Sequence, residues 1–176
     1  MVDHCSVSWS VDECLSVYGM ENSTVQWCIG SEALRKATHV KGAHGYGGNW
    51  GGHKASYHHN LIAHCESRVP RLGPRPSTLA LGECVDIRNN VFYNWAGNGC
   101  YGGEDQHVNI VNNYYKPGPV NAVAKVHCRI FTAYLDDGKN QQAKGVYGKF
   151  YVNGNYFETH EKLSNSQKTE LANANA

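Results

Sequence analysis

The sequence has no long hydrophobic run, little charge and only weak helical patterns. Nothing in its 176 residues approaches the roughly 20 consecutive apolar residues that a membrane helix needs. Charged residues make up 18% of the chain and the formal net charge is +1, which argues against a general electrostatic attraction to nucleic acid. We therefore expect no membrane partner and no nucleic-acid partner, and we expect a monomer.

The common metal and redox motifs are also missing. The seven cysteines form no Cys-x-x-Cys pair and the ten histidines form no His-Glu-x-x-His motif, so zinc ribbons, thioredoxin-like sites and zinc proteases are disfavoured. The odd cysteine count leaves at least one free thiol, and we favour small buried residues over a disulfide framework. His58 and His59 are adjacent in a predicted strand, which would place them on opposite faces, unable to share one zinc ion.

Glycine and tyrosine are abundant instead, with 19 and 11 residues, which is typical of strands and tight turns. The helical signals are short and lie at residues 31–37, 161–164 and 167–176, the last within the polar tail 164–176. Period-2 alternation is stronger, and it recurs at Val25/Trp27, Ala55/Tyr57/His59, Val85/Ile87/Asn89, Val108/Ile110/Asn112 and Phe150/Val152/Gly154.

Most of these predicted strands end in the same way, with a turn that contains asparagine and then an apolar pair. The turns hold Asn60, Asn90, Asn113 and Asn155, at irregular intervals of about 23 to 42 residues. A unit that repeats with variable loops predicts an all-β parallel β-helix, in which asparagine amides of successive coils form a ladder. A β-sandwich with asparagine turns is the alternative, although its turns would vary in type.

The glycine-rich stretch 42–52 does not match a phosphate-binding loop. No Gly-Lys-Ser/Thr follows it, and its spacing misses Gly-x-Gly-x-x-Gly. We interpret this stretch as a tight turn.

Positive charge is concentrated around the run Ser67-Arg68-Val69-Pro70-Arg71, with Lys41 and Arg75 nearby in sequence. Arginine pairs bidentately with carboxylates, and an acidic polysaccharide offers one carboxylate per sugar. Asp12 and Glu13 supply adjacent carboxylates, and calcium prefers such oxygens. From the residues alone, an anion-binding site and an exposed basic turn are equally supported.

These residues carry a resemblance. The chain resembles the pectate lyases of polysaccharide lyase family 1, particularly the bacterial pectate trisaccharide-lyases, and the matching stretches run in family order at residues 3–13, 24–29, 39–52, 58–61, 67–71 and 108–118. The resemblance implies a right-handed parallel β-helix that cleaves polygalacturonate by calcium-dependent β-elimination. It also implies that the full-length protein is secreted or periplasmic.

The resemblance also implies residue roles. Arg68 matches the arginine that abstracts the proton, Lys41 matches a lysine that holds a substrate carboxylate, and Arg71 matches the second arginine of the motif. A further family arginine falls on Gly73, so Arg75 is a loose substitute. Because arginine is protonated at neutral pH, base catalysis by Arg68 predicts an alkaline optimum.

The implied metal ligands depart from the family pattern. Asp12 matches a calcium carboxylate, but the second carboxylate, four positions on, is Ser16 here, and we expect Glu13 to serve instead. Residues 1–6 lack the basic and apolar regions of a signal peptide and resemble the interior of a strand. We therefore interpret residues 1–176 as one partial β-helix domain, incomplete at both ends, with an exposed strand edge and weak activity alone.

Two other functions remain open at this point. A non-catalytic β-helix that binds acidic polysaccharide would use the same arginines and lysine only to hold uronates. A β-helical hydrolase would need paired carboxylates, and Asp136-Asp137 is the only adjacent pair of aspartates.

Overall fold

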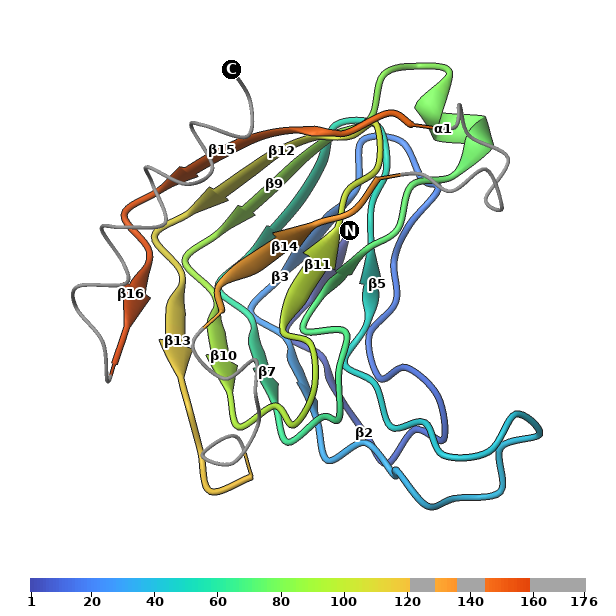
Figure 1. Cartoon of the computed structure of the whole chain (residues 1–176), viewed down its shortest axis with the longest axis vertical. Coiled ribbons are helices and arrows are strands. Elements are labelled where there is room, and N and C mark those ends of the chain that lie inside the picture. The colour runs from blue at the N-terminus through green and yellow to red at the C-terminus, as the bar shows by residue number, and fades with distance from the viewer. Residues whose placement is uncertain (121–128, 136–144, 159–176) are drawn as a thin grey trace.

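The computed structural model describes residues 1–120, 129–135 and 145–158, and their strands stack into a parallel β-helix (Figure 1). The described strands are β1 (Val2–Asp3), β2 (Ser6–Ser8), β3 (Thr24–Gln26), β4 (Ile29–Ser31), β5 (Asn49–Trp50), β6 (Ala55–His58), β7 (Leu61–Ala63), β8 (Arg71–Leu72), β9 (Cys84–Arg88), β10 (Val91–Tyr93), β11 (Cys100–Gly102), β12 (His107–Val111), β13 (Tyr114–Lys116), β14 (Phe131–Ala133), β15 (Lys149–Asn153) and β16 (Tyr156–Phe157).

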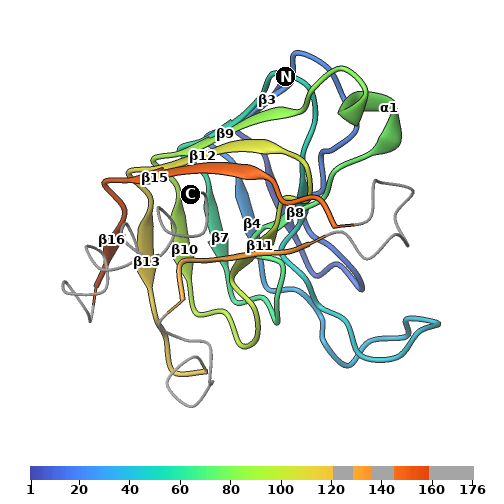
Figure 2. The same ribbon diagram turned by 45° about the horizontal axis from the view of Figure 1, so that its top comes forward.

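The strands form three parallel sheets. The first has the order β1-β3-β6-β9-β12-β15, the second β16-β13-β10-β7-β4-β2 and the third β14-β11-β8-β5. A full coil gives one strand to each sheet, so that β9, β10 and β11 lie in register on β6, β7 and β8 (Figure 2). The predicted all-β parallel β-helix is confirmed, and the sandwich alternative is excluded because every strand pair is parallel.

The core lies inside the coils, because successive side chains of a strand point to opposite sides of its sheet. In the first sheet Val25, Tyr57 and Ile87 lie in register and are buried. In the second sheet Phe92 and Tyr115 lie in register, with ring centroids 5.0 Å apart. The period-2 pattern therefore marks the inward faces within the strands, but it fails at its last members Trp27 and His59, which have left-handed backbones and are not buried.

The predicted asparagine ladder is present. Its members are Asn60, Asn90, Asn113 and Asn155, all buried, and each side-chain amide donates to the next carbonyl oxygen along the stack at 3.0, 3.0 and 2.9 Å. The Oδ1 atoms of Asn90, Asn113 and Asn155 also accept from the backbone N–H of the preceding ladder asparagine, and that of Asn60 accepts from the backbone N–H of Cys28. The ladder thus satisfies polar groups that would otherwise be buried without partners.

The residue before each ladder position has a left-handed backbone, with φ values of 57° at His59 and 54° at Asn89 and Asn112. This corner makes the prediction for His58 and His59 wrong. Strand β6 ends at His58, and the reversal at His59 brings the two Nδ1 atoms to 2.8 Å from each other instead of placing the rings on opposite faces.

The helix predictions are also partly wrong. Residues 31–37 form no helix, because Ser31 completes β4 and the chain then turns away from the sheets. The short helix α1 (Pro76–Leu79) was not predicted; it begins with proline, whose fixed φ suits the first turn of a helix. The polar tail 164–176, the helical signal at 161–164, Cys128 and the pair Asp136-Asp137 lie outside the described residues.

The cysteines in the described part of the chain are free, and Cys28, Cys65 and Cys100 are buried, as expected for cysteines that pack as small apolar residues. Cys5 and Cys84 are exposed. A search of the described residues finds no helix with the length and hydropathy of a membrane span.

Candidate active site

The candidate site lies on the outer face of the third sheet. In β5 and β8 the inward positions are Trp50 and Leu72, which are fully buried. The alternate positions, Asn49 and Arg71, are therefore directed outward and lie side by side in register. Strand alternation thus places polar side chains of neighbouring coils on one surface.

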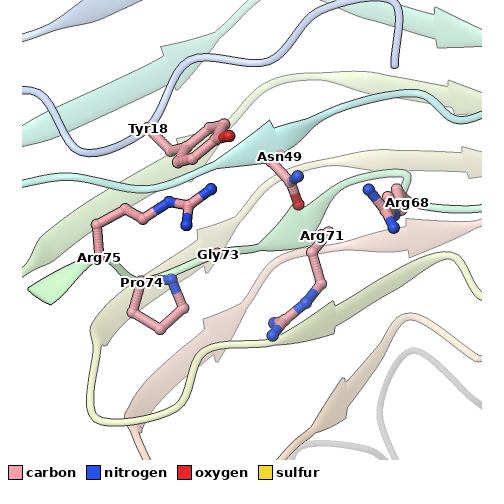
Figure 3. A pocket seen from close by; sticks show the side chains of 7 residues that line it. All are labelled: Tyr18, Asn49, Arg68, Arg71, Gly73, Pro74 and Arg75. Atoms are coloured by element: carbon pink, nitrogen blue, oxygen red, sulfur yellow. The ribbon is translucent and has the colours of Figure 1, made fainter. Parts of the chain in front are cut away.

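A pocket of about 170 Å³ opens on this surface. Figure 3 shows Asn49 between the guanidinium groups of Arg68 and Arg75, with the Arg71 side chain extending away from them. The pocket combines three cations with a tyrosine ring, and its lining residues are Tyr18, Asn49, Arg68, Arg71, Gly73, Pro74 and Arg75.

The Arg68 backbone is held by the glycine-rich stretch of the preceding coil. The N–H of Gly48 donates to the Arg68 carbonyl oxygen at 2.8 Å. A Cβ on Gly47 would lie 2.6 Å from that same oxygen, and one on Gly48 only 1.9 Å from the Leu15 oxygen. The interpretation of the whole stretch as a tight turn is therefore incomplete: its second half runs into β5, and the glycines allow three coils to stack closely.

The Arg68 side chain forms an ion pair with the Glu13 carboxylate. Its guanidinium carbon also lies 4.2 Å from the centroid of the Tyr46 ring, a cation–π contact. Asn49 Nδ2 donates to Glu13 Oε1 at 3.1 Å, so Glu13 joins two pocket residues. Burial, and next the neighbouring Tyr101, raises the pKa of Tyr46, so this ring remains neutral in mildly alkaline solution.

Arg71 is anchored more firmly. Its Nη1 and Nη2 atoms donate to the two carboxylate oxygens of Glu104 at 2.9 and 2.6 Å, a bidentate pair. The Glu104 residue is only 3% exposed. Arg71 is therefore held rigidly at the edge of the pocket, and its positive charge is largely neutralised by Glu104.

Arg75 differs from the other two arginines. Its guanidinium carbon lies 4.3 Å from the centroid of the Tyr18 ring, and in the described residues no carboxylate pairs with it. Its backbone N–H donates to the buried Glu83 at 3.0 Å, which fixes the main chain while the side chain stays exposed. Arg75 is thus the best placed of the three to bind an incoming carboxylate.

Of the remaining predicted site residues, Glu13 contacts two residues of the pocket lining, whereas Lys41 and Asp12 have their contacts elsewhere. Lys41 is exposed on the loop between β4 and β5 and does not line the pocket. Asp12 faces His39 and His44 on that loop, at 3.7 and 3.9 Å, whereas the adjacent Glu13 faces Arg68. The two predicted calcium ligands have different partners, imidazole on one side and guanidinium on the other.

This arrangement does not fit a calcium site built from Asp12 and Glu13. Calcium takes six to eight oxygen ligands, whereas in the described residues Asp12 faces two imidazoles and Glu13 faces a guanidinium and the Asn49 amide nitrogen.

Sequence reasoning missed Tyr18, Tyr46, Asn49 and Glu104. Asn49 could have been found from the sequence, because it precedes the apolar Trp50 and strand alternation would direct it outward. The structure then places it beside Arg71. The other three come from separate coils and reach the arginines only through the stacking, which no local pattern records.

A thiol next to this site has an unusual acidity. The hydrogen bond from Cys65 lowers the pKa of Cys14 from 9.0 to about 7, against the opposing effect of burial. We therefore predict that alkylation of Cys14 by iodoacetamide accelerates as the pH rises through about 7, because the thiolate is the nucleophile. Peptide mass spectrometry separates this site from the exposed Cys5 and Cys84.

Cys65→Ala removes the donor and should move the Cys14 labelling profile toward higher pH. An unchanged profile in that variant would contradict the assigned cause.

Comparison with known proteins adds an independent observation. Probable pectate lyase C of Aspergillus flavus is 34% identical over 155 residues, covering 81% of this chain and 33% of the relative. The protein of the same name from Aspergillus fumigatus is also 34% identical over 155 residues, with the same coverage, and that of Emericella nidulans is 33% identical over 157 residues, 89% of this chain and 30% of the relative. No protein-family profile matches the chain.

The chain is similar to proteins named pectate lyase. It spans about a third of the length of the curated relatives it matches. The similarity to pectate lyase therefore supports the expected class of protein, whereas the finer assignment to family 1 and to a bacterial type has no support here.

Proposed function

We propose that this chain carries the arginine-bearing part of a secreted pectate lyase, which cleaves polygalacturonate by β-elimination. The observation that carries the proposal is the pocket on the third sheet, where three arginines from one segment meet Tyr18 and Asn49. A polyuronate offers regularly spaced carboxylates to such a pocket. The similarity to proteins named probable pectate lyase C supports the same class of reaction.

In this proposal Arg68 removes the proton from the carbon next to a uronate carboxylate. The electron pair forms a carbon–carbon double bond, the glycosidic bond on the neighbouring carbon breaks, and the leaving oxygen takes a proton from solvent. Arg75 binds a carboxylate and stabilises the negative charge that develops during proton removal. Arg71 holds the position of the strand, and Lys41 binds a carboxylate farther along the polymer.

Arg68 must first lose its own proton and its contact with Glu13. Without substrate, the Glu13 carboxylate occupies the Arg68 guanidinium. Substrate binding therefore has to separate the pair, and the activity should be greatest at alkaline pH. A calcium requirement, implied by the sequence resemblance, is kept in the proposal, with ligands other than the Asp12 and Glu13 pair.

The test is an ultraviolet assay of polygalacturonate incubated with the protein, because β-elimination creates an unsaturated, absorbing product. We expect the absorbance to increase with time. The rate of this increase should fall when chelator is added and recover when calcium is restored. Cleavage that releases reducing ends without this absorbance would identify a hydrolase instead and overturn the proposal.

A second prediction concerns Arg75. Arg75→Ala should raise KM for polygalacturonate roughly tenfold or more while kcat changes less, because a charge-assisted bond to substrate is worth about 1.5–3 kcal/mol. Arg88→Ala is the matched control: Arg88 is on the first sheet and pairs with Asp86. Equal effects of the two substitutions would contradict a substrate-binding role for Arg75.

One observation favours a second function, a β-helix that binds acidic polysaccharide without cleaving it. Arg68 is held by the Glu13 carboxylate, and a guanidinium can bind anions without acting as a base. This function predicts retention of the protein on immobilised polygalacturonate, with no absorbing product at any pH.

A further inference from the structure

The loop between β4 and β5 folds back on the first coil through two histidines. It is the extension at the lower right of Figure 1, reaching away from the sheets. His39 Nε2 lies 3.7 Å from Asp12 Oδ2, and His44 Nε2 lies 3.9 Å from Asp12 Oδ1. The two imidazole rings face each other with centroids 3.8 Å apart, so three donors converge on one point.

The donor atoms are close enough to share one ion. One ligand atom from each of the three residues lies within 4.8 Å of the others. Around a tetrahedral ion with bonds of about 2.0–2.2 Å, ligand atoms are roughly 3.3–3.6 Å apart. The separations of 3.7 and 3.9 Å between the imidazole nitrogens and the Asp12 oxygens thus need only small side-chain movements.

Two further features prepare this cluster for a cation. Asp12 Oδ1 is inaccessible to solvent and has no hydrogen-bond partner among the residues that the structure describes, which leaves a buried acceptor unsatisfied. His44 Nδ1 lies 3.0 Å from the Gly42 carbonyl oxygen, so Nδ1 carries the proton and the Nε2 lone pair is directed at Asp12. A backbone carbonyl behind a ligating histidine is the usual outer-shell arrangement at metal sites.

His39 needs one adjustment. Its Nδ1 accepts a hydrogen bond from the Lys41 N–H at 3.2 Å, which places the ring proton on Nε2. To ligate through Nε2, the proton moves to Nδ1 and the exposed Lys41 N–H bonds to water instead. The exchange leaves the charge of the protein unchanged.

The donor set selects the kind of metal. Two imidazoles and one carboxylate suit zinc and the neighbouring transition metals, whereas calcium and magnesium prefer oxygen ligands. We propose that Asp12, His39 and His44 form a binding site for a zinc-class divalent cation, with water as the fourth ligand. The bound ion ties the loop, and with it the Lys41 region, to the coil that carries Glu13. It also gives Asp12 a role different from the calcium ligand that the sequence suggests.

The experiment is isothermal titration of the metal-free full chain with Zn²⁺, followed by titration with Co²⁺, whose visible spectrum reports its coordination. We expect one strong site and a four-coordinate cobalt spectrum. His44→Ala and Asp12→Asn should each weaken Zn²⁺ binding at least a hundredfold. His53→Ala is the matched control, because His53 Nδ1 also contacts a backbone carbonyl, that of Gly82, yet lies outside the cluster.

Unchanged Zn²⁺ affinity in the double variant His39→Ala/His44→Ala would overturn the site, as would equal competition by Ca²⁺. Circular dichroism of each metal-free variant verifies that the β-helix is intact, so loss of binding cannot be ascribed to unfolding. Protection of the 33–48 loop from trypsin by Zn²⁺, seen in the parent chain and absent from the double variant, supports the proposal. None of these measurements depends on lyase activity, so the site stands or fails separately from the proposed function.

Discussion

Replacing Arg68 with lysine is expected to abolish formation of the unsaturated product while the protein remains folded. The loss should be roughly 100- to 10,000-fold, the range that a positioned general base contributes. Lysine keeps the positive charge, but its shorter ammonium group lacks the planar guanidinium that lies over Tyr46. The measurement is the initial rate of ultraviolet absorbance with polygalacturonate over a range of alkaline pH.

The matched control is Arg71→Lys, at the other arginine of the same motif. That substitution breaks the bidentate pair with Glu104, so it should lower thermal stability and reduce activity less than Arg68→Lys does. If Arg68→Lys kept full activity, Arg68 would not be the base. Binding of the inactive variant to immobilised polygalacturonate would separate loss of catalysis from loss of affinity.

The second large effect is expected in the asparagine ladder. Asn90→Ala should lower the free energy of unfolding by roughly 3–5 kcal/mol, because several buried groups lose their partners together. Asn90 Oδ1 accepts from both the backbone and the side chain of Asn60, and its Nδ2 donates to the Tyr57 carbonyl and to Asn113. Urea unfolding followed by circular dichroism measures the change.

Asn109→Ala is the control for that substitution. Asn109 lies in β12, and its side chain makes a longer 3.3 Å bond to Asp86 at the surface of the first sheet. We expect its effect to stay below about 1 kcal/mol, because it is a single, long and only partly buried hydrogen bond. A comparable loss in both variants would mean that the ladder contributes no more than an ordinary surface bond.

The regular part of the fold was predictable from local patterns. Alternation of apolar residues marks which side chains of a strand point inward, and this needs only the geometry of the strand itself. The asparagine at Asn60, Asn90 and Asn113 repeats because each one occupies the same place in its coil. Both patterns can be recognised within a short stretch of neighbouring residues. Neither requires knowing how many residues separate one coil from the next.

The corners were not predictable in the same way. His59 has φ of 57°, and an ordinary strand pattern extended through it puts its ring on the wrong side. The prediction for 31–37 failed because Ser31 pairs with Ala63 as the end of β4, and the next backbone N–H groups, of Glu32 and Leu34, donate to other coils instead of to a helical turn. In both places a contact with a neighbouring coil overrides the local preference.

For the site, the sequence by itself determined which residues carry charge and which segment concentrates it: Arg68, Arg71 and Arg75 lie together because they are close in the chain. Only the tertiary structure decided their partners. Stacking brings Glu13, from 55 positions earlier, onto Arg68, and Glu104 onto Arg71. It also gives Asp12 and Glu13 different partners, because the β4–β5 loop brings His39 and His44 to Asp12. Charge is a property of each residue, whereas pairing depends on which coils lie next to each other.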